Sequence, residues 1–174
     1  MDVVYNYFLP DEYVKNIFQI SPEKLKEKGI KGIITDLDNT LVEWDRPEAT
    51  PEITEWVKQM NDAGLQVTIL SNNNNERVQT FCGPLNTPYI CDARKPLQKS
   101  FKRALEMMKL QKNEVVMVGD QLMTDILGGN RFGLHTILVV PVASSDGFVT
   151  KFNRMIERRI MGKMKKRGMI KWEE

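Results

Sequence analysis

The sequence predicts an α/β fold in which five parallel strands form one open, doubly wound sheet flanked by helices. Short apolar runs alternate along the chain with stretches of helical periodicity, which is typical of strand–helix–strand units. Right-handed crossovers would place all five strands in a single sheet. At 174 residues, with 41% hydrophobic and 28% charged residues, the chain has the size and composition of one globular domain. We therefore expect a single domain over residues 1–174.

The predicted strands are apolar runs of strand length bounded by polar residues or turns. They are "KGIITDL" (31–37), "LQVTIL" (65–70), "TPYICD" (87–92), "EVVMVGD" (114–120) and "HTILVV" (135–140). No internal repeat, low-complexity tract or interdomain linker separates them. This continuity supports one sheet rather than two smaller units.

Helices are predicted between the strands from caps and apolar periodicity. Thr50 and Pro51 offer an N-cap and a proline at the first helical position, and Gly64 would end that helix. Its apolar residues recur at helical spacing, at Ile53, Trp56, Val57 and Met60. A second apolar stripe consists of Leu97, Phe101, Ala104, Leu105 and Met108. The segment "MTDILGGNRFG" (123–133) predicts a brief helix ended by its glycines.

Both ends of the chain are predicted to be helical. Residues 1–29 form an N-terminal helical extension that contains the capped piece "SPEKLKEKG" (21–29). Residues 148–174 form a basic C-terminal helix and tail, with one apolar helix face made of Phe148, Phe152, Met155, Ile156 and Ile160. We expect 148–160 to pack on the core. For 161–174, packing on the protein and contact with an anionic partner are equally open.

The charge of the chain is unevenly distributed. The net charge is only +2, yet Lys151 to Glu174 contains nine Lys or Arg against three Glu. No apolar run approaches the roughly 18 residues that span a bilayer, and the N-terminus lacks the basic region of a signal peptide. Cys82, Cys91 and a single histidine cannot supply the four ligands of a usual zinc site. We expect a cytoplasmic protein, with peripheral contact at the inner face of the membrane as an option.

Chemically able side chains follow four of the predicted strands at their C-terminal ends. In chain order they are Asp36 and Asp38, Ser71 and Asn72, Lys95, and finally Asp120 and Asp125. Ligands of open α/β sheets bind outside the carboxyl ends of the strands. These groups are therefore expected to share one cleft.

This set of groups suits Mg²⁺ and phosphate. Mg²⁺ prefers oxygen ligands and commonly takes one or two carboxylates together with water and substrate phosphate. Asp36 and Asp120 are the expected direct ligands, with Asp125 direct or through water. The cation, with a lysine, would offset the mutual repulsion of the acids.

The same groups suit phosphoryl transfer. Carboxylates can accept a phosphoryl group and form aspartyl-phosphates. Lys95, Ser71 and backbone N–H groups could stabilise the transferring group. Asp38 is placed to protonate the leaving oxygen and later to activate water.

Simpler interpretations exist for each part. An acidic pair after a strand can be a solvated turn, Ser71 can cap a helix, and Lys95 can be an ordinary surface lysine. A calcium-binding EF-hand loop starting at Asp36 is excluded, because its sixth residue is Leu41 and its twelfth is Pro47. A two-component receiver domain is set aside because the lysine here precedes the final acids. The occurrence of all these groups at strand ends favours an active site.

With these residues in place, the sequence resembles the haloacid dehalogenase (HAD) superfamily of phosphatases. The matching motifs are Asp36-Leu37-Asp38-Asn39-Thr40, Ser71-Asn72, Lys95-Pro96, and Gly119-Asp120 through Asp125. "GDQLMTDILGGNRFG", together with "LPDEYVKNIF", is similar to the YqeG-like group of subclass IIIA. The resemblance implies a Rossmann-like HAD core and, from aspartate as the second acid, a phosphatase.

The resemblance also implies roles for the motif residues. It implies Asp36 as nucleophile and Asp38 as general acid/base. Ser71 and Lys95 would hold phosphate, and we group Asn72 of the second motif with them. Mg²⁺ would bind Asp36, the backbone carbonyl of Asp38, and Asp120. Asp125 joins these as a candidate metal ligand from its place in the cleft.

The motif spacing leaves no room for a cap domain. The chain from Asp38 to Ser71 fits one helix and one strand, and the chain from Ser71 to Lys95 is shorter. We therefore expect an open site that suits a bulky substrate or a partner subunit. YqeG-like proteins also resemble the phosphatidylglycerophosphate phosphatases of mitochondria and plastids, which makes a phospholipid headgroup a candidate substrate. The basic tail, with Trp172 at the interface, would suit anionic lipid.

Two other functions stay open. One is a non-catalytic module that docks on RNA, a ribosome or a membrane. The other is a phosphatase that acts on a nucleic-acid end or a phosphoprotein, since attraction to a phosphate backbone is independent of sequence. Trp172 is nearly the only aromatic residue among the basic ones of the tail, which argues against base stacking, and no DNA partner is expected. The sequence does not fix the oligomeric state.

Overall fold

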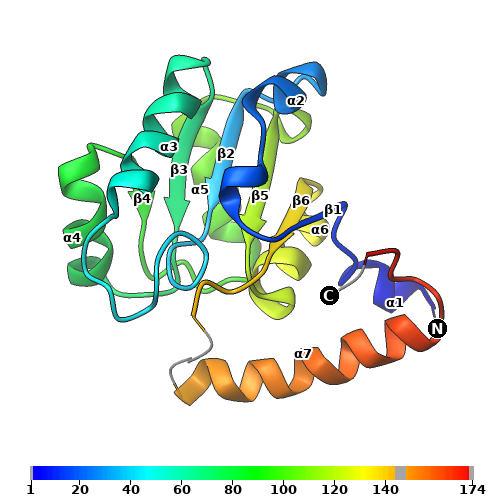
Figure 1. Cartoon of the computed structure of the whole chain (residues 1–174). Coiled ribbons are helices and arrows are strands. Elements are labelled where there is room, and N and C mark those ends of the chain that lie inside the picture. The colour runs from blue at the N-terminus through cyan, green and yellow to red at the C-terminus, as the bar shows by residue number, and fades with distance from the viewer. Residues whose placement is uncertain (1, 144–147, 173–174) are drawn as a thin grey trace.

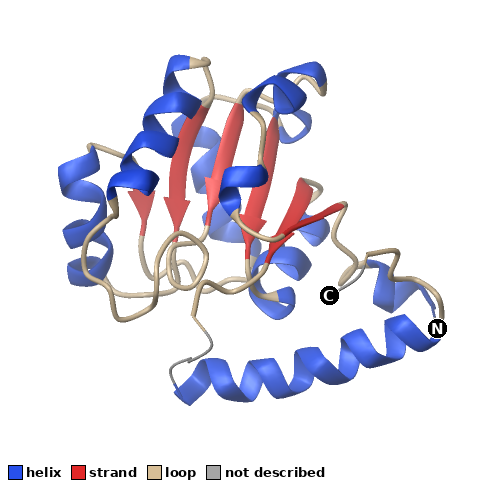
Figure 2. Cartoon of the chain, viewed as in Figure 1, coloured by secondary structure: helices blue, strands red, loops and turns tan. Residues whose placement is uncertain are grey.

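A six-stranded parallel sheet with helices on both faces forms the body of the protein (Figures 1 and 2). The computed structural model describes residues 2–143 and 148–172. The strands lie in the order β1-β6-β5-β2-β3-β4. The α/β class is therefore confirmed, and the expectation of five strands is wrong by one.

The five predicted strands are present within their predicted ranges. They are β2 (Gly32–Thr35), β3 (Gln66–Leu70), β4 (Tyr89–Ile90), β5 (Val115–Gly119) and β6 (His135–Val139). The central strand β2 pairs with β3 on one side and with β5 on the other. The residues that follow β2 and β5 are therefore neighbours at the carboxyl edge.

The additional strand β1 (Glu12–Val14) lies at the sheet edge beside β6. It falls in the 1–29 segment, which was expected to be helical. Its three half-buried residues form no apolar run, so the pattern gave no strand signal. Side-chain bonds reinforce the pairing: the carboxylate of Asp11 accepts a hydrogen bond from the backbone N–H of Thr136 at 2.8 Å. The same segment contains α1 (Asp2–Asn6) and a 3-10 turn at Ile17–Gln19.

Three helices cover one face of the sheet, and each begins at a side-chain cap. They are α2 (Pro22–Glu27), α3 (Pro51–Asp62) and α4 (Asn75–Leu85). The side chains of Ser21, Thr50 and Asn74 accept bonds from backbone N–H groups in the first turn of each helix. The predictions of α2 and α3 are confirmed. Helix α4 begins within the asparagine run, where the sequence suggested only a cap.

Two helices cover the opposite face. Helix α5 (Gln98–Met108) buries the predicted apolar stripe, with the exception of the exposed Leu97 before it. Helix α6 (Leu127–Phe132) follows a turn of π-helix, η3 (Leu122–Ile126). A short 3-10 turn, η2 (Lys112–Glu114), precedes β5. Successive residues of β2 face opposite sides, so that Ile33 packs with α3 and Ile34 packs with α5.

The C-terminal helix α7 (Phe148–Lys166) runs along the carboxyl side of the sheet (Figure 1). The expectation that its stripe over 148–160 packs on the core is wrong for Phe152 and Met155, which are 60% and 44% exposed. The expectation is confirmed for Ile160, which packs together with Met161 and Met164 against Leu122, Ile126 and Leu138. The side chain of Phe148 lies outside the described part.

The tail beyond α7 packs back on the N-terminal segment. Trp172 stacks on Tyr13 with 5.2 Å between ring centroids, and the guanidinium of Arg167 lies 4.6 Å from the Tyr5 ring centroid. For residues 161–172, of the two open options, these contacts support packing on the protein. Residues 173–174 lie outside the described chain. Among the described residues, no helix is long and apolar enough to cross a membrane. That residues 1–174 form a single domain stays a prediction.

Gly129 allows α6 to approach the sheet closely, which leads to a stability prediction. A Cβ at this position would lie 2.7 Å from the Thr136 Cγ2 and 3.1 Å from the Met117 Cβ. We expect Gly129→Ala to destabilise the protein by about 1–3 kcal/mol through overpacking, measured by urea unfolding. The control is Gly162→Ala in α7, where a Cβ meets open space and a better helix former should not destabilise. Equal stability of the two variants would contradict the packing argument.

Candidate active site

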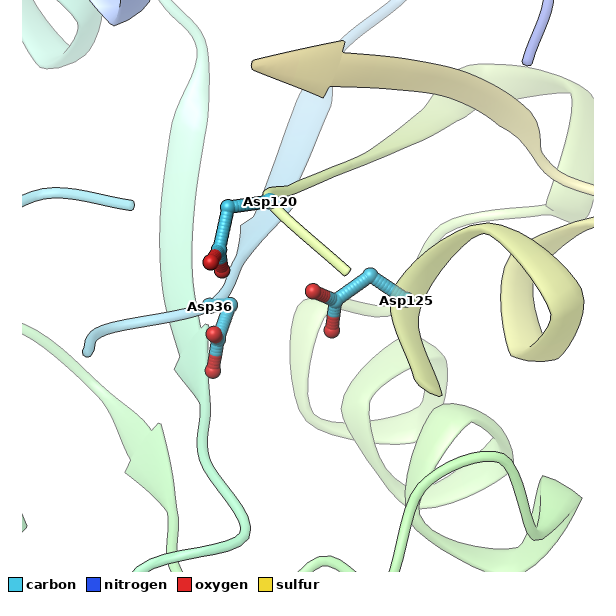
Figure 3. Close-up of side chains that lie close together, drawn as sticks. All are labelled: Asp36, Asp120 and Asp125. Atoms are coloured by element: carbon cyan, nitrogen blue, oxygen red, sulfur yellow. The ribbon is translucent and has the colours of Figure 1, made fainter. Parts of the chain in front are cut away.

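Three buried carboxylates meet at the carboxyl edge of the sheet. Asp36 follows β2, Asp120 follows β5, and Asp125 lies in η3 (Figure 3). One oxygen of each lies within 4.8 Å of the other two. The structure therefore brings together three of the acids that the sequence placed at strand ends. Hard oxygen donors at this spacing fit a divalent metal ion.

Lys95 connects two of these acids. Its Nζ lies 2.8 Å from an oxygen of Asp36 and 2.8 Å from an oxygen of Asp125, and its side chain is almost fully buried. Burial alone would lower the pKa of Lys95, but the two carboxylates raise it above its ordinary value. The lysine is thus a permanent cation of the site rather than a surface residue.

The remaining predicted residues line a cavity of about 430 Å³ beside the acids. Its lining residues are Asp36, Asp38, Ser71, Asn72, Asn73, Lys95, Gln121, Thr124 and Asn153. Asn72 fixes the loop that carries the lysine, since its Oδ1 accepts a bond from the Lys95 backbone N–H at 2.7 Å. Ser71 is buried, and its hydroxyl accepts a bond from the backbone N–H of Asn73 at 3.1 Å. Both residues therefore lie where the sequence placed them.

Asp38 faces the outer part of the cavity. Its carboxylate accepts hydrogen bonds from the Asn73 Nδ2 at 2.9 Å and the Arg77 Nε at 3.2 Å. Burial raises the pKa of Asp38, against the lowering by Asn73 and Arg77. Its carboxylate is not a member of the three-acid group, and the ligand expected from this residue was its backbone carbonyl.

Comparison with known proteins agrees with an active site at this edge of the sheet. A family model for haloacid dehalogenase-like hydrolases matches residues 10–133, which include all four predicted motifs. The chain belongs to this family. It is an enzyme, a HAD-type phosphatase.

The relatives agree with this assignment. The chain is 64% identical to "Probable phosphatase YqeG" of Bacillus subtilis, over 97% of this chain and 98% of that protein. It is 26% identical to "Phosphatidylglycerophosphate phosphatase 1, chloroplastic/mitochondrial" of Arabidopsis thaliana, over 94% of this chain but only 50% of that protein. A solved protein from Listeria monocytogenes shares the fold with a TM-score of 0.55 at 20% identity, covering 68% of this chain and 85% of that one.

In this HAD site, the acids are held near one another despite their repulsion. Burial, followed by repulsion from Asp36, raises the pKa of Asp120 well above its usual value. Burial also raises the pKa of Asp125, against the lowering by Lys95. A bound divalent cation would favour the charged form of both acids. The donor chemistry and the burial of the site thus fit a metal-dependent HAD enzyme.

Three residues that contact the predicted acids were not among the candidates from the sequence. Asn73 and Arg77 bind Asp38 from the asparagine run and α4. Asn73 directly follows the second motif, Ser71-Asn72, and the N-cap Asn74 starts α4 next to it, so the sequence did contain a signal for this region. Arg154 of α7 pairs with Asp120 and donates from Nη1 to the Asp120 backbone oxygen at 2.6 Å. No local pattern links it to an acid 34 residues earlier in the chain.

Gly119 positions Asp125, which leads to a prediction. A Cβ on Gly119 would fall on the carboxyl group of Asp125. We expect Gly119→Ala to displace that carboxylate and to lower the rate of phosphate release by about 100-fold. Colorimetric phosphate assays would measure the rate, and circular dichroism would check the fold. Gly162→Ala, which adds the same methyl group in open space, is the control. An undiminished rate in Gly119→Ala would show that the position of Asp125 does not matter.

Proposed function

We propose that the chain is a Mg²⁺-dependent phosphomonoesterase that works through an aspartyl-phosphate on Asp36. The observation that carries this proposal is the Asp36 carboxylate, held by a buried lysine and adjoining two further buried acids and the cavity. Asp36, Asp120 and Asp125, with the carbonyl of Asp38, would hold the metal ion. When bound, the ion would neutralise charge on the phosphate and the acids.

The chain's own residues would carry the two steps. An oxygen of Asp36 attacks phosphorus, and the bond from phosphorus to the leaving oxygen breaks. Asp38 gives its proton to that oxygen, and the raised pKa of Asp38 favours the protonated acid this requires. A water molecule then gives a proton to Asp38 and attacks phosphorus, which releases inorganic phosphate from Asp36.

Lys95, Ser71 and Asn72 would bind the phosphate during both steps. The Lys95 ammonium contacts the attacking carboxylate, so a phosphate bound at Asp36 would have its oxygens close to this positive charge. Asn72 keeps the lysine loop in place through its bond to the Lys95 backbone. These groups need little rearrangement, because the hydrogen bonds among them already exist.

Replacing the nucleophile tests the mechanism. Asp36→Asn keeps the shape of the side chain but removes the attacking anion, so we expect phosphate release to fall by at least about a thousandfold. The assay would use p-nitrophenyl phosphate and a panel of natural monoesters, with Mg²⁺ and with EDTA. An exposed acid outside the site, as in Asp62→Asn, provides the matched control. Full activity in Asp36→Asn would assign the nucleophile elsewhere.

A phospholipid headgroup, such as that of phosphatidylglycerophosphate, is our candidate substrate. Between Asp38 and Ser71 the described chain contains α3 and β3, and between Ser71 and Lys95 it contains α4 and β4. Neither connection holds a cap domain, which leaves the cavity open to a bulky substrate. The Arabidopsis relative, of which the chain spans about half, supports the choice by its printed name. A nucleic-acid end or a phosphoprotein is the alternative substrate.

The outer face of α7 is the proposed contact with an anionic membrane. Phe152 and Met155 are exposed there, and the helix also carries exposed basic residues: Lys151, Arg158, Arg159, Lys163, Lys165 and Lys166. Apolar and basic residues together favour binding in the interface of anionic lipid. Because Asn153 of the same helix lines the catalytic cavity, such binding would bring the cavity close to the lipid headgroups. A membrane-docking or RNA-docking module without catalysis is the rival function, and the catalytic cavity argues against it.

Vesicle flotation tests the membrane contact. We expect Phe152→Ser with Met155→Ser to lower binding to phosphatidylglycerol vesicles by at least about tenfold, because two apolar side chains no longer enter the bilayer. The matched control is Phe18→Ser with Met107→Ser, since these residues are 53% and 44% exposed at other sites. Equal losses in the two double variants would contradict a specific role for α7. A phosphatase screen with phosphatidylglycerophosphate, sugar phosphates and nucleotides would identify the substrate independently.

A further inference from the structure

Arg154 ties α7 to a carboxylate of the candidate metal site. Its guanidinium pairs with the Oδ2 of Asp120 through Nη2 and donates to the Asp120 backbone oxygen through Nη1. The other carboxylate oxygen of Asp120, Oδ1, accepts a hydrogen bond from the hydroxyl of Thr40 at 2.8 Å. Both oxygens of this acid therefore already have a partner, and one of these partners is a cation from a different element.

The arginine is itself held by a buried acid. Glu157, one turn further along α7, accepts a hydrogen bond from the Arg154 Nη1 at 3.1 Å. The other carboxylate oxygen of Glu157 accepts a bond from the Met123 backbone N–H at 3.0 Å. Glu157 is buried, although it belongs to the most basic segment of the chain. Arg154 and Glu157 thus form a polar anchor that attaches α7 to Asp120 and to Met123 in η3.

A divalent cation at the three acids would approach this guanidinium closely. Asp120 would contact both positive charges, and at such short distances in a buried site their repulsion is weakly screened. The attraction of Asp120 for a metal ion is therefore reduced as long as Arg154 stays paired with it. Metal binding should in turn weaken the hold of Arg154 on Asp120.

We propose that Arg154 is a positioning residue that shares Asp120 with the metal ion, so that docking of α7 and binding of Mg²⁺ oppose each other. The inference rests on the metal-dependent function proposed above. Because coupling between two binding events is reciprocal, an α7 released from Asp120 leaves a site with higher affinity for Mg²⁺. By the same reciprocity, Mg²⁺ loosens the first turns of α7. The helix that borders the catalytic cavity would then respond to the metal.

Calorimetric titration with Mg²⁺ alone tests the coupling without any substrate. We expect Arg154→Gln to bind Mg²⁺ at least about fivefold more tightly than the unaltered protein. Arg159→Gln removes the same charge from an exposed position of the same helix, and we expect it to leave the affinity nearly unchanged. Arg154→Lys keeps the charge but loses the two-pronged contact, so its affinity should lie between those of the unaltered protein and Arg154→Gln.

A second variant separates the charge of Arg154 from a general loosening of α7. Glu157→Gln weakens the contacts of residue 157 with the Met123 backbone and with Arg154, but it keeps the guanidinium and its contact with Asp120. If the coupling acts through the arginine, Glu157→Gln does not tighten Mg²⁺ binding. If Glu157→Gln tightens it as much as Arg154→Gln does, looseness of the helix is the cause and the proposal is overturned.

Hydrogen exchange of the α7 amides gives an independent readout. In the unaltered protein, Mg²⁺ should speed exchange over residues 151–158, whereas in Arg154→Gln exchange should be fast and insensitive to Mg²⁺. Unchanged or slower exchange with Mg²⁺, or an equal or weaker Mg²⁺ affinity in Arg154→Gln, overturns the coupling alone. Absence of Mg²⁺ binding in every protein would overturn both the coupling and the metal-dependent function.

Discussion

The contact of one buried ammonium with two carboxylates is the constraint on which the site depends. The Nζ of Lys95 lies 2.8 Å from an oxygen of Asp36 and 2.8 Å from an oxygen of Asp125. These acids come from different elements, since Asp36 follows β2 and Asp125 lies in η3. Without a cation between them, two desolvated carboxylates would not stay so close. The chain elements that place Lys95 therefore matter as much as the strands that carry the acids. Chief among these is Asn72, which accepts a bond from the lysine backbone.

The sheet supplies the rest of the convergence. Parallel pairing of β2 with β5 in register places Thr35 beside Val118, so the residues just beyond these strands emerge together. Gly119 then leaves room for the carboxyl of Asp125, which η3 directs back toward the sheet. The acids are thus close to one another because of the register of β2 and β5 and because Gly119 has no side chain. The base of the site, made of the three acids and Lys95, is therefore set by the sheet and by η3.

The sequence predicted most of this base, because the relevant signals were local. Apolar runs located five strands, and the acids and the lysine followed them directly. Strand β1 was not predicted, because its three residues form no apolar run. Hydrogen bonds between Asp11 and Thr136 beside it help to hold this edge strand in the sheet. The helical periodicity of α7 was right, but the predicted buried face was only partly right, because Phe152 and Met155 are exposed whereas Ile160 packs on the core. Its buried side is set by Glu157 and Met164, whose partners in η3 and β6 are distant in sequence.

Three cations from different elements pair with the four acids of the site: Lys95 with Asp36 and Asp125, Arg77 with Asp38, and Arg154 with Asp120. These cations differ in how easily they can be exchanged. Lys95 is almost fully buried, whereas the side chains of Arg77 and Arg154, which pair with Asp38 and Asp120, are partly exposed. If Lys95 moved away from Asp36 and Asp125, these buried carboxylates would be left without a counter-charge, so we expect the lysine to keep its position. Arg77 and Arg154 keep some contact with solvent, so water can replace the carboxylate at lower cost than in the fully buried Lys95 pairs. Asp38 and Asp120 are therefore the acids whose counter-charges can move, whereas Asp36, the proposed nucleophile, shares the fixed counter-charge of Lys95 with Asp125. In the proposed mechanism the attacking carboxylate has to keep one position, and the fixed contact of Asp36 with Lys95 would provide this.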